Sequence, residues 1–336
     1  NYVKKNEKFE KVNFSEAIET VANKTKEIIK KFGSESILYV DFAGNEGLVN
    51  NIFARRLWNF LGVSFTDQAL CTATGHLGIG LHYGETYGIQ ANEIESKKLI
   101  IFWGFNAAVS AIHIWKMALD AKKNNNAKIV VIDPICNATA QNADFFFQIN
   151  PSTDVLLAYS LMKIIIEKNK HDIHFIEQNT IGFEKLKQKI ELISLDYVAQ
   201  QTGINETQIE QLAHLIIDAG KESGTMIGVS LQKRIGGAEQ VRCISLIPAI
   251  MGIHRGFLYS NSQALNVDTD FIAGKYLNNS QKELPMVSTA ENINNGLVKM
   301  LVINSMNPAV SLPNTNAFLK SIKQQKPFIV VNETHW

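Results

Sequence analysis

Short apolar runs alternate with amphipathic segments along nearly the whole chain. Nearly continuous apolar runs predict β-strands that are buried on both faces, and they lie at residues 36–40, 97–104, 127–134, 145–150, 224–230, 297–305 and 328–333. Apolar residues at helical spacing predict helices, and these lie at residues 13–33, 46–62, 107–125, 154–169, 202–220 and 236–252, with a further helical segment near residue 184. Because strands alternate with helices, we expect an α/β fold with parallel sheets.

End signals sharpen the prediction for the first two helices. Ser15 is the expected N-cap of the first helix and Gly33 its stop, while Gly62 ends the second helix. The expected core face of the second helix consists of Val49, Ile52, Phe53, Leu57 and Phe60. Residues 261–292 show little predicted structure, and a loop of that length is typical of a segment that carries a site.

The length of the chain favours two lobes. Single hydrophobic cores stop growing at about 250–300 residues, and this chain has 336. Its first residue is not methionine, and both ends are irregular or cut close to a predicted element. We therefore expect these residues to be the middle of a longer polypeptide.

Composition narrows the class of partner. The 33 Lys and Arg residues nearly balance the 32 Asp and Glu residues, so the net charge of +1 predicts no binding to nucleic acid or to an anionic membrane surface. No stretch approaches the roughly 18 apolar residues that a transmembrane helix needs. We expect a cytoplasmic protein with a small-molecule substrate, although an export signal could precede these residues.

Three cysteines lie far apart, at Cys71, Cys136 and Cys243, which does not suggest a disulfide framework or a closed zinc site. Cys71 stands in "FTDQALCTATGHLG", where a glycine-rich stretch leads into a predicted helix. From the residues alone, Cys71 is a packing residue, a redox thiol or a metal ligand. Hydrolytic motifs such as GxSxG and HExxH do not occur.

Polar residues follow several predicted strands, where ligands of parallel sheets bind. In "FWGFN", Gly104 and Asn106 precede a predicted helix whose N-terminus would favour a phosphate. Asp133 follows the next strand and is placed to accept a hydrogen bond from a ribose hydroxyl. Considered alone, Asp133 is equally a common strand terminator, and Asn106 an ordinary helix-entry residue.

Two further loops carry polar groups. "NPSTD" contains Ser152, Thr153 and Asp154, and a carboxylate at that place could accept hydrogen bonds from a guanine edge or cap the helix. "INSMNPAVSLP" supplies polar side chains at Asn304, Ser305 and Asn307. These loops together are typical of a nucleotide-binding protein.

The loops, taken in order, resemble the molybdopterin oxidoreductases, which are the enzymes of the dimethyl-sulfoxide-reductase superfamily. These enzymes bind molybdenum or tungsten through two molybdopterin guanine dinucleotides. The stretches that carry the resemblance are "FSEAIETVANKTKEIIKKFGSESI", "LIIFWGFNAA", "KIVVIDPICNATAQNADFFFQINPSTDVLLA", "TGINETQIEQLA", "GVSLQKRIGGAEQVRCISLIPAIMG", "LVINSMNPAVSLP" and "FIVVNETHW".

The resemblance implies two Rossmann-like lobes with parallel sheets, one inserted in the other. Residues 1–95 and 223–336 would form the outer cofactor-binding domain, and residues 96–222 the inserted dinucleotide-binding domain. It also implies an N-terminal domain with a [4Fe–4S] cluster and a C-terminal β-rich domain, neither of which lies in these residues. Electrons would then pass through the cluster to a further subunit or carrier.

The resemblance assigns residues to each dinucleotide. The first would contact Gly104, Asn106, Asp133, Pro134 and Asp154, with Ser152 and Thr153 in the same loop. The second would contact Gly228, Ser230, Gln232, Gln263, Asn307, Asn332 and Glu333.

Cys71 falls where the family carries its protein-derived metal ligand, and a thiolate suits a sulfur-rich site. His76, one helical turn further on, is the candidate for proton transfer or else a structural histidine. Cys136 and Cys243 have no such role in the family and are expected to be packing residues.

Two departures bear on the substrate. Formate dehydrogenases of the family place a histidine directly after the metal ligand and an arginine two residues before the glutamine in the long loop, where this chain has Thr72 and Asn261. The resemblance therefore implies a two-electron oxidoreductase other than a formate dehydrogenase. Two alternatives are a non-catalytic relative, such as the large subunit of complex I, and a non-redox hydratase.

Overall fold

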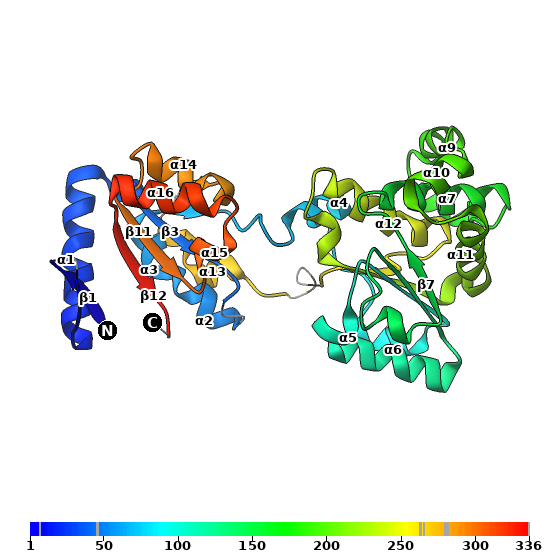
Figure 1. The fold of residues 1–336 in the computed structure, drawn as a ribbon, viewed down its shortest axis with the longest axis horizontal. Helices are drawn as coiled ribbons and strands as arrows, with labels where there is room; N and C mark the ends of the chain where they lie inside the picture. Colours follow the sequence, from blue (N-terminus) through cyan, green and yellow to red (C-terminus); the bar gives the residue numbers. More distant parts are fainter. Residues whose placement is uncertain (7, 45–46, 262–263, 265, 279–281, 335–336) are drawn as a thin grey trace. The chain divides into compact units, whose positions relative to one another are not determined.

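The chain forms two compact units, each built around its own five-stranded sheet (Figure 1). The computed structural model describes residues 1–6, 8–44, 47–261, 264, 266–278 and 282–334. The first unit combines residues 1–70 with 267–336, and the second unit comprises residues 71–266. The second unit is thus inserted into the first, as expected for nested lobes.

The sheet of the first unit is parallel throughout and has the order β10-β4-β3-β11-β12. Its strands are β3 (Ile37–Asp41), β4 (Ser64–Thr66), β10 (Glu283–Leu284), β11 (Met300–Asn304) and β12 (Phe328–Asn332). Apolar residues of α1 (Phe14–Phe32) and α3 (Arg55–Leu61) cover one face. Residues of α14 (Thr289–Asn294) and α16 (Thr315–Gln325) cover the other.

The sheet of the second unit has the order β7-β6-β5-β8-β9 and is also parallel. Its strands are β5 (Leu99–Trp103), β6 (Lys128–Asp133), β7 (Phe145–Gln148), β8 (Ser223–Ile227) and β9 (Phe257–Leu258). Side chains of β5 alternate between two cores. Leu99, Ile101 and Trp103 pack with α7 (Asp154–Glu167), α11 (Glu206–Ala219) and α12 (Gly237–Ile250), and Ile100 and Phe102 pack with α6 (Ile112–Asn125).

The remaining helices of the second unit extend these layers. Those on the first face are α4 (Ala73–Tyr83), α7 (Asp154–Glu167), α8 (Ile173–Asn179), α9 (Phe183–Glu191), α10 (Leu195–Thr202), α11 (Glu206–Ala219) and α12 (Gly237–Ile250). The opposite face carries α5 (Ala107–Ser110) and α6 (Ile112–Asn125). Smaller elements of the first unit are β1 (Tyr2–Lys5), β2 (Lys8–Lys11), α2 (Leu48–Phe53), α13 (Thr269–Ala273) and α15 (Pro308–Ser311).

Both sheets share one topology. The first three strands in chain order run outward to one edge, and the fourth and fifth lie on the other side of the first. The order therefore reverses between β3 and β11 in the first unit and between β5 and β8 in the second. This arrangement confirms the Rossmann-like expectation, and ligands of such sheets bind beyond the carboxyl ends of the strands at the point of reversal.

The domain boundaries differ from the predicted ones at 95/96 and 222/223. β8 pairs with β5, β9 pairs with β8 in the same sheet, and α4 packs against α12, so residues 71–95 and 223–266 belong to the second unit. The sequence pattern located β3, β5 to β8, β11 and β12 but missed the short strands β4, β9 and β10. It did not give the partners of the strands, because pairing between distant segments leaves no local periodicity.

The predicted helix over residues 46–62 is two helices, α2 and α3, which meet at Ala54. Its predicted core face is wrong, because Val49, Phe53, Leu57 and Phe60 are exposed. The break turns a different face of α3 inward, where Trp58 and Leu61 pack beneath the sheet. Asn59 is buried there and donates its amide to Ala273 O at 2.7 Å.

Other local expectations changed less. Asn13, not Ser15, caps α1, since its side chain accepts from Glu16 N at 2.9 Å. The described part of residues 261–292 contains α13, β10 and the start of α14.

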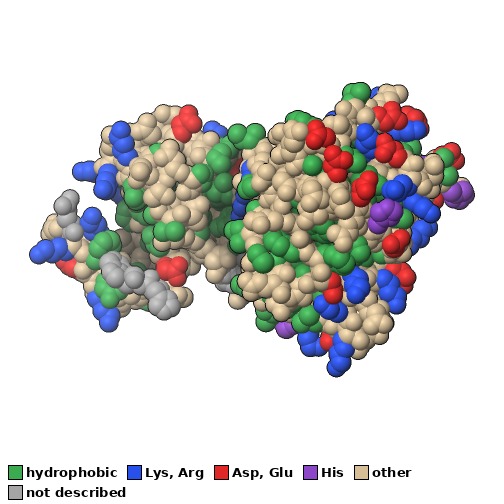
Figure 2. All heavy atoms as spheres, turned by 45° about the vertical axis from the view of Figure 1, so that its right-hand side comes forward, with side chains coloured by type: hydrophobic (Ala, Val, Ile, Leu, Met, Phe, Trp, Pro, Cys, Tyr) green, Lys and Arg blue, Asp and Glu red, His purple; other side chains and the backbone are tan. Residues whose placement is uncertain are grey.

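Acidic and basic side chains are interspersed on the face that Figure 2 shows. No helix among the described residues is long and apolar enough to cross a bilayer.

Candidate functional site

In the second unit, the loops after β5 and β8 meet at the point where the strand order reverses. Gly104 has φ +60° and donates to Ile132 O at 2.8 Å, and Gly228 N donates to Trp103 O at the same distance. Ser230 Oγ donates to Gly104 O at 2.9 Å. A Cβ on Gly228 would lie 1.8 Å from Gly104 O, so the two backbones touch and leave no room for a side chain.

Asn106 does not begin a long helix. α5 is a single turn, and α6 starts only at Ile112. The first N–H groups of α5 are already bonded, because Ala107 N donates to Phe105 O and Ala108 N donates to Thr139 Oγ1. The helix-dipole argument for a phosphate here is therefore wrong. Asn106 Oδ1 instead accepts from Thr139 Oγ1 at 2.9 Å, and its contact with a cofactor stays a prediction.

Asp133 ends β6 and folds back onto its own loop. Its carboxylate accepts from Ile135 N at 2.9 Å and from Asn137 Nδ2 at 3.1 Å. Burial raises the pKa of Asp133, and these two hydrogen bonds act against that shift. Pro134 O accepts from Gln148 Nε2, which ties the loop to the neighbouring strand β7.

Ser152, Thr153 and Asp154 form the entry to α7. Ser152 has φ +77°, a left-handed conformation that costs energy in a residue other than glycine, and Thr153 Oγ1 donates to Asn150 O. Asp154 is 4% exposed and makes no helix cap; its Oδ1 accepts from Trp103 Nε1 at 2.8 Å. Burial raises the pKa of Asp154, while nearby Arg234 lowers it.

Trp103 and Arg234 were missed at the sequence level. Trp103 looked like one more apolar residue in a strand, and Arg234 lies 80 residues from Asp154 in "LQKRIGG". Their link to Asp154 depends on neighbouring strand ends and could not be read from local spacing.

Cys71 lies in a turn directly before α4, and its side chain is partly exposed. Tyr259 is buried close by, with its Oη 3.5 Å from Thr72 O. Burial raises the pKa of Tyr259 most, and the charge of the nearby Cys71 raises it further. Gly75 N donates to Gln232 Oε1, so three segments that are distant in sequence, at residues 71–75, Gln232 and Tyr259, meet near the thiol.

His76 faces this cluster from the first turns of α4. Its Nδ1 lies 2.7 Å from Thr86 Oγ1, and its ring packs edge-on against Tyr259 with centroids 5.6 Å apart. Burial lowers the pKa of His76, so the ring is neutral at pH 7.

The other two cysteines differ from each other. Cys243 is buried on α12, as expected of a packing residue, and burial raises its pKa to about 12. Cys136 is exposed, so the expectation that it packs in a core is wrong: it lies in the loop after β6, which projects beyond the sheet.

The side chains of Arg255 and Asn261 make hydrogen bonds to the backbone of the segment after α4. Arg255 donates to Tyr83 O, Glu85 O and Tyr87 O at 2.7–2.9 Å, and its guanidinium lies 4.1 Å from the ring centroid of Tyr87. Asn261 accepts from Gly88 N at 3.0 Å and donates to Ile89 O at 2.9 Å. Both side chains stabilise the backbone that follows α4.

Arg255→Ala is expected to lower the free energy of unfolding by about 2–3 kcal/mol, because it removes charge-assisted hydrogen bonds and a stacked ring. Urea unfolding measures the change. Lys233→Ala, at an exposed lysine, is the control and should stay within about 0.5 kcal/mol of the wild type. Equal stabilities for the two variants would contradict the prediction.

In the first unit, the carboxyl ends of β3, β11 and β12 carry the remaining predicted residues. Asn332 Nδ2 donates to Asn304 Oδ1 at 2.7 Å. Asn307 precedes α15, and Glu333 accepts from Thr334 N. Gln263, assigned to the same cofactor, lies outside the described residues.

Gly44 was missed at the sequence level. Gly44 N donates to Ser305 O at 2.7 Å, and a Cβ on Gly44 would lie 2.2 Å from that oxygen. Gly44 and Ser305 follow the two strands between which the strand order reverses, as Gly104 and Gly228 do in the second unit. The same close approach of two loops therefore occurs at the same topological position in both units.

Asp41, at the end of β3, was also missed. It is 1% exposed, and its carboxylate accepts from Arg55 Nε at 2.7 Å and from Arg55 Nη2. The sequence signal was present, because an aspartate directly follows an apolar strand in "SILYVD".

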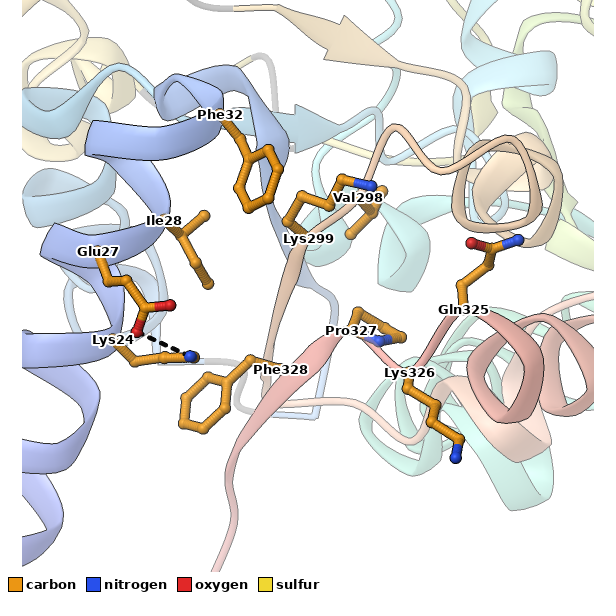
Figure 3. Close-up of a pocket in the computed structure, with 10 residues that line it drawn as sticks. All are labelled: Lys24, Glu27, Ile28, Phe32, Val298, Lys299, Gln325, Lys326, Pro327 and Phe328. Atoms are coloured by element: carbon orange, nitrogen blue, oxygen red, sulfur yellow. Dashed lines mark hydrogen bonds and ion pairs between the residues drawn. The ribbon is translucent and has the colours of Figure 1, made fainter.

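A cavity of about 340 Å³ lies elsewhere in the first unit, at the amino ends of β11 and β12. Figure 3 shows Ile28 and Phe32 of α1 and Phe328 of β12 turned toward the same space. This cavity is at the opposite edge of the sheet from Asn304 and Asn332. No group of three or more His, Cys, Asp or Glu side chains within the described part of the chain is arranged to hold a metal ion.

Comparisons with known proteins agree on one family. A family model described as molybdopterin oxidoreductase matches residues 2–336. The probable oxidoreductase YoaE of Bacillus subtilis (strain 168) is 32% identical over 339 residues, which cover 97% of this chain and 49% of that protein. Formate dehydrogenase H of Escherichia coli (strain K12) is 29% identical over 252 residues, covering 73% of this chain and 34% of that protein.

Among solved structures, acetylene hydratase from Pelobacter acetylenicus matches with a TM-score of 0.77 and 20% identity. The match covers 96% of this chain and 50% of that one. The chain spans about half the length of the curated relatives YoaE and YyaE of Bacillus subtilis, at 49% and 48%.

Proposed function

Because the chain belongs to the molybdopterin oxidoreductase family, we propose that it forms the cofactor-binding core of a molybdenum or tungsten enzyme. The enzyme would carry out two-electron redox chemistry on a small molecule, with Cys71 as the protein ligand of the metal. Two molybdopterin guanine dinucleotides would complete the site. The observation that carries the proposal is a close contact between two loops at the same topological position in each unit, together with the partly exposed thiol of Cys71. The contacts are between Gly104 and Gly228 and between Gly44 and Ser305.

The second unit fits one dinucleotide. At Gly104 and Gly228 the backbones are in contact, which holds the ends of β5 and β8 together at the point of strand reversal, where ligands of parallel sheets bind. Asp154 lies at the entry to α7 as a buried carboxylate, and one of its oxygens is held by Trp103. We propose that Asp154 recognises the guanine and that Asp133 recognises the ribose.

The first unit fits the second dinucleotide. Gly44 and Ser305 make the equivalent close approach, and Asn304, Asn307 and Asn332 supply amide groups at the same edge. Gly228 and Ser230, which the resemblance places on this second ligand, lie beside Gly104 in the second unit. We therefore propose one nucleotide per unit, with Gly228 and Ser230 moved to the first ligand.

Cys71 suits the metal because a thiolate is a soft ligand and matches the dithiolene sulfurs of the pterins. When bound, the cofactor supplies a metal that cycles between +4 and +6 while an oxygen, sulfur or hydride equivalent is transferred. Burial lowers the pKa of His76, which favours the neutral ring, and Thr86 fixes the ring through Nδ1. Its Nε2 is the atom that would accept a proton during turnover.

Formate is not the proposed substrate. Thr72 offers no imidazole next to Cys71, and Asn261 already uses its amide on Gly88 and Ile89. Electrons are proposed to leave through a [4Fe–4S] cluster in a preceding domain, toward a further subunit or carrier.

Metal and nucleotide analysis tests this function. The full-length protein, made in a host that supplies the cofactor, is expected to carry one Mo or W and two guanine nucleotides per chain. In Cys71→Ala, X-ray absorption should count one sulfur ligand fewer at the metal, while the exposed Cys136→Ala serves as the control and should match the wild type. Wild-type protein without metal and nucleotide would overturn the proposal, as would an unchanged sulfur count in Cys71→Ala.

A second candidate is a non-redox hydratase, favoured by the match to acetylene hydratase in both fold and sequence. The two candidates differ in whether the oxidation state of the metal changes during turnover. Electron paramagnetic resonance of the full-length protein during reductive titration and turnover separates them.

A further inference from the structure

The start of α4, which follows Cys71, has no local cap. Thr72 occupies the N-cap position but its side chain makes no capping hydrogen bond. The first N–H groups of a helix have no partner within the helix, and a side chain normally satisfies one of them. Here Gly75 N donates to Gln232 Oε1, from a residue 157 positions away.

Close packing fixes the same turn on its other sides. A Cβ on Gly75 would lie 2.1 Å from Tyr259 Oη, and a Cβ on Gly78 would lie 2.2 Å from Ala238 O of α12. Both glycines are buried. The helix therefore lies directly against Tyr259 and α12, and its first turn has little freedom to shift.

We propose that Gln232 is a positioning residue for Cys71. Its amide oxygen anchors the first turn of α4, and this anchor sets the backbone from which the thiol projects. Gln232 is 4% exposed, and its oxygen is already engaged by Gly75 N, which distinguishes this role from the cofactor contact implied by family resemblance. The inference rests on the proposed function in that Cys71 is taken as the metal ligand.

Two variants of Gln232 distinguish an anchor for Gly75 from a direct contact with the cofactor, because they differ in whether an acceptor oxygen remains. Gln232→Glu keeps an acceptor oxygen at the same reach, and a carboxylate is favourable at a helix N-terminus. Gln232→Leu removes the acceptor and keeps the volume. A residue that donated its amide to a cofactor phosphate would behave in the opposite way, because glutamate would repel the anion.

The first readout is amide hydrogen exchange at Gly75 in the full-length holoenzyme. Gln232→Leu should raise the exchange rate roughly three- to tenfold, the effect of losing one hydrogen bond, and Gln232→Glu should leave it within about twofold. Gln232→Asn, whose oxygen falls short of Gly75, should behave like leucine and replaces it if the leucine variant does not fold. Gln240→Leu is the matched control: Gln240 is 3% exposed on α12, and its Oε1 has no partner in the described structure.

The second readout is the electron paramagnetic resonance spectrum of the metal in the same proteins. The signal should shift in Gln232→Leu and stay unchanged in Gln232→Glu and Gln240→Leu. Unchanged Gly75 exchange in the leucine and asparagine variants would overturn the positioning role, as would loss of guanine nucleotide in Gln232→Glu with Gly75 still protected. The proposed function fails separately, through an unchanged sulfur count in Cys71→Ala.

Discussion

Gly228→Ala is expected to destabilise the second unit by about 3 kcal/mol and to remove the guanine nucleotide that we propose this unit binds. Gly228 has φ −75°, which alanine adopts without strain, so the effect is purely steric. The new Cβ would lie 1.8 Å from Gly104 O and 2.4 Å from its carbonyl carbon. Backbone atoms cannot move aside as a flexible side chain does, and forced overpacking costs roughly 1–3 kcal/mol or more.

The loss of nucleotide follows from the same clash, because separating the loops after β5 and β8 widens the place where the backbone would approach a phosphate. Urea unfolding and nucleotide content per chain measure the two effects. Gly80→Ala is the control: Gly80 lies within α4, nothing lies within 4 Å of its added Cβ, and alanine should be neutral or stabilise by up to about 1 kcal/mol. If Gly228→Ala retained both stability and nucleotide, the contact between the loops after β5 and β8 would not be part of the cofactor site.

Much of the fold was predictable because strands of a parallel sheet covered on both faces are continuously apolar. The runs ending at Trp103, Asp133 and Asn304 identified β5, β6 and β11, and each is followed by polar residues at the edge where ligands bind. The candidate loops therefore followed from strand ends alone. The family resemblance then assigned Cys71, for which local composition left three possibilities open.

What sequence could not supply is contact between distant segments. Gln232 was assigned to a cofactor through the family resemblance, and nothing near it in sequence suggests Gly75 as a partner. The exposed stripe on α2 and α3 shows the same limit, since periodicity assumes one continuous helix and Ala54 interrupts it. Gly44 was missed because the need for a glycine there comes from its contact with Ser305, in the loop after β11.

The buried ion pair between Asp41 and Arg55 in the first unit leads to the second prediction with a large expected effect on stability. Asp41 is 1% exposed and Arg55 is 18% exposed, and two N–H groups of the guanidinium bond to the carboxylate. Removing one partner leaves the other charge buried and unpaired, which costs about 3–5 kcal/mol. We therefore expect Asp41→Leu and Arg55→Met each to lower the free energy of unfolding by about 3 kcal/mol.

The double variant Asp41→Leu with Arg55→Met should recover to within about 1 kcal/mol of the wild type, because replacing both charges by apolar groups removes the desolvation cost as well as the attraction. Urea unfolding of the four proteins gives the coupling energy between the two sites. Glu27→Gln is the control in the same unit, since Glu27 pairs with Lys24 at 2.8 Å on the exposed side of α1, and a surface pair contributes less than about 1 kcal/mol. Additive effects of the two single variants would show that the ion pair does not hold the end of β3, and that the edge next to Gly44 is ordered by the packing of Arg55 over Phe65 instead.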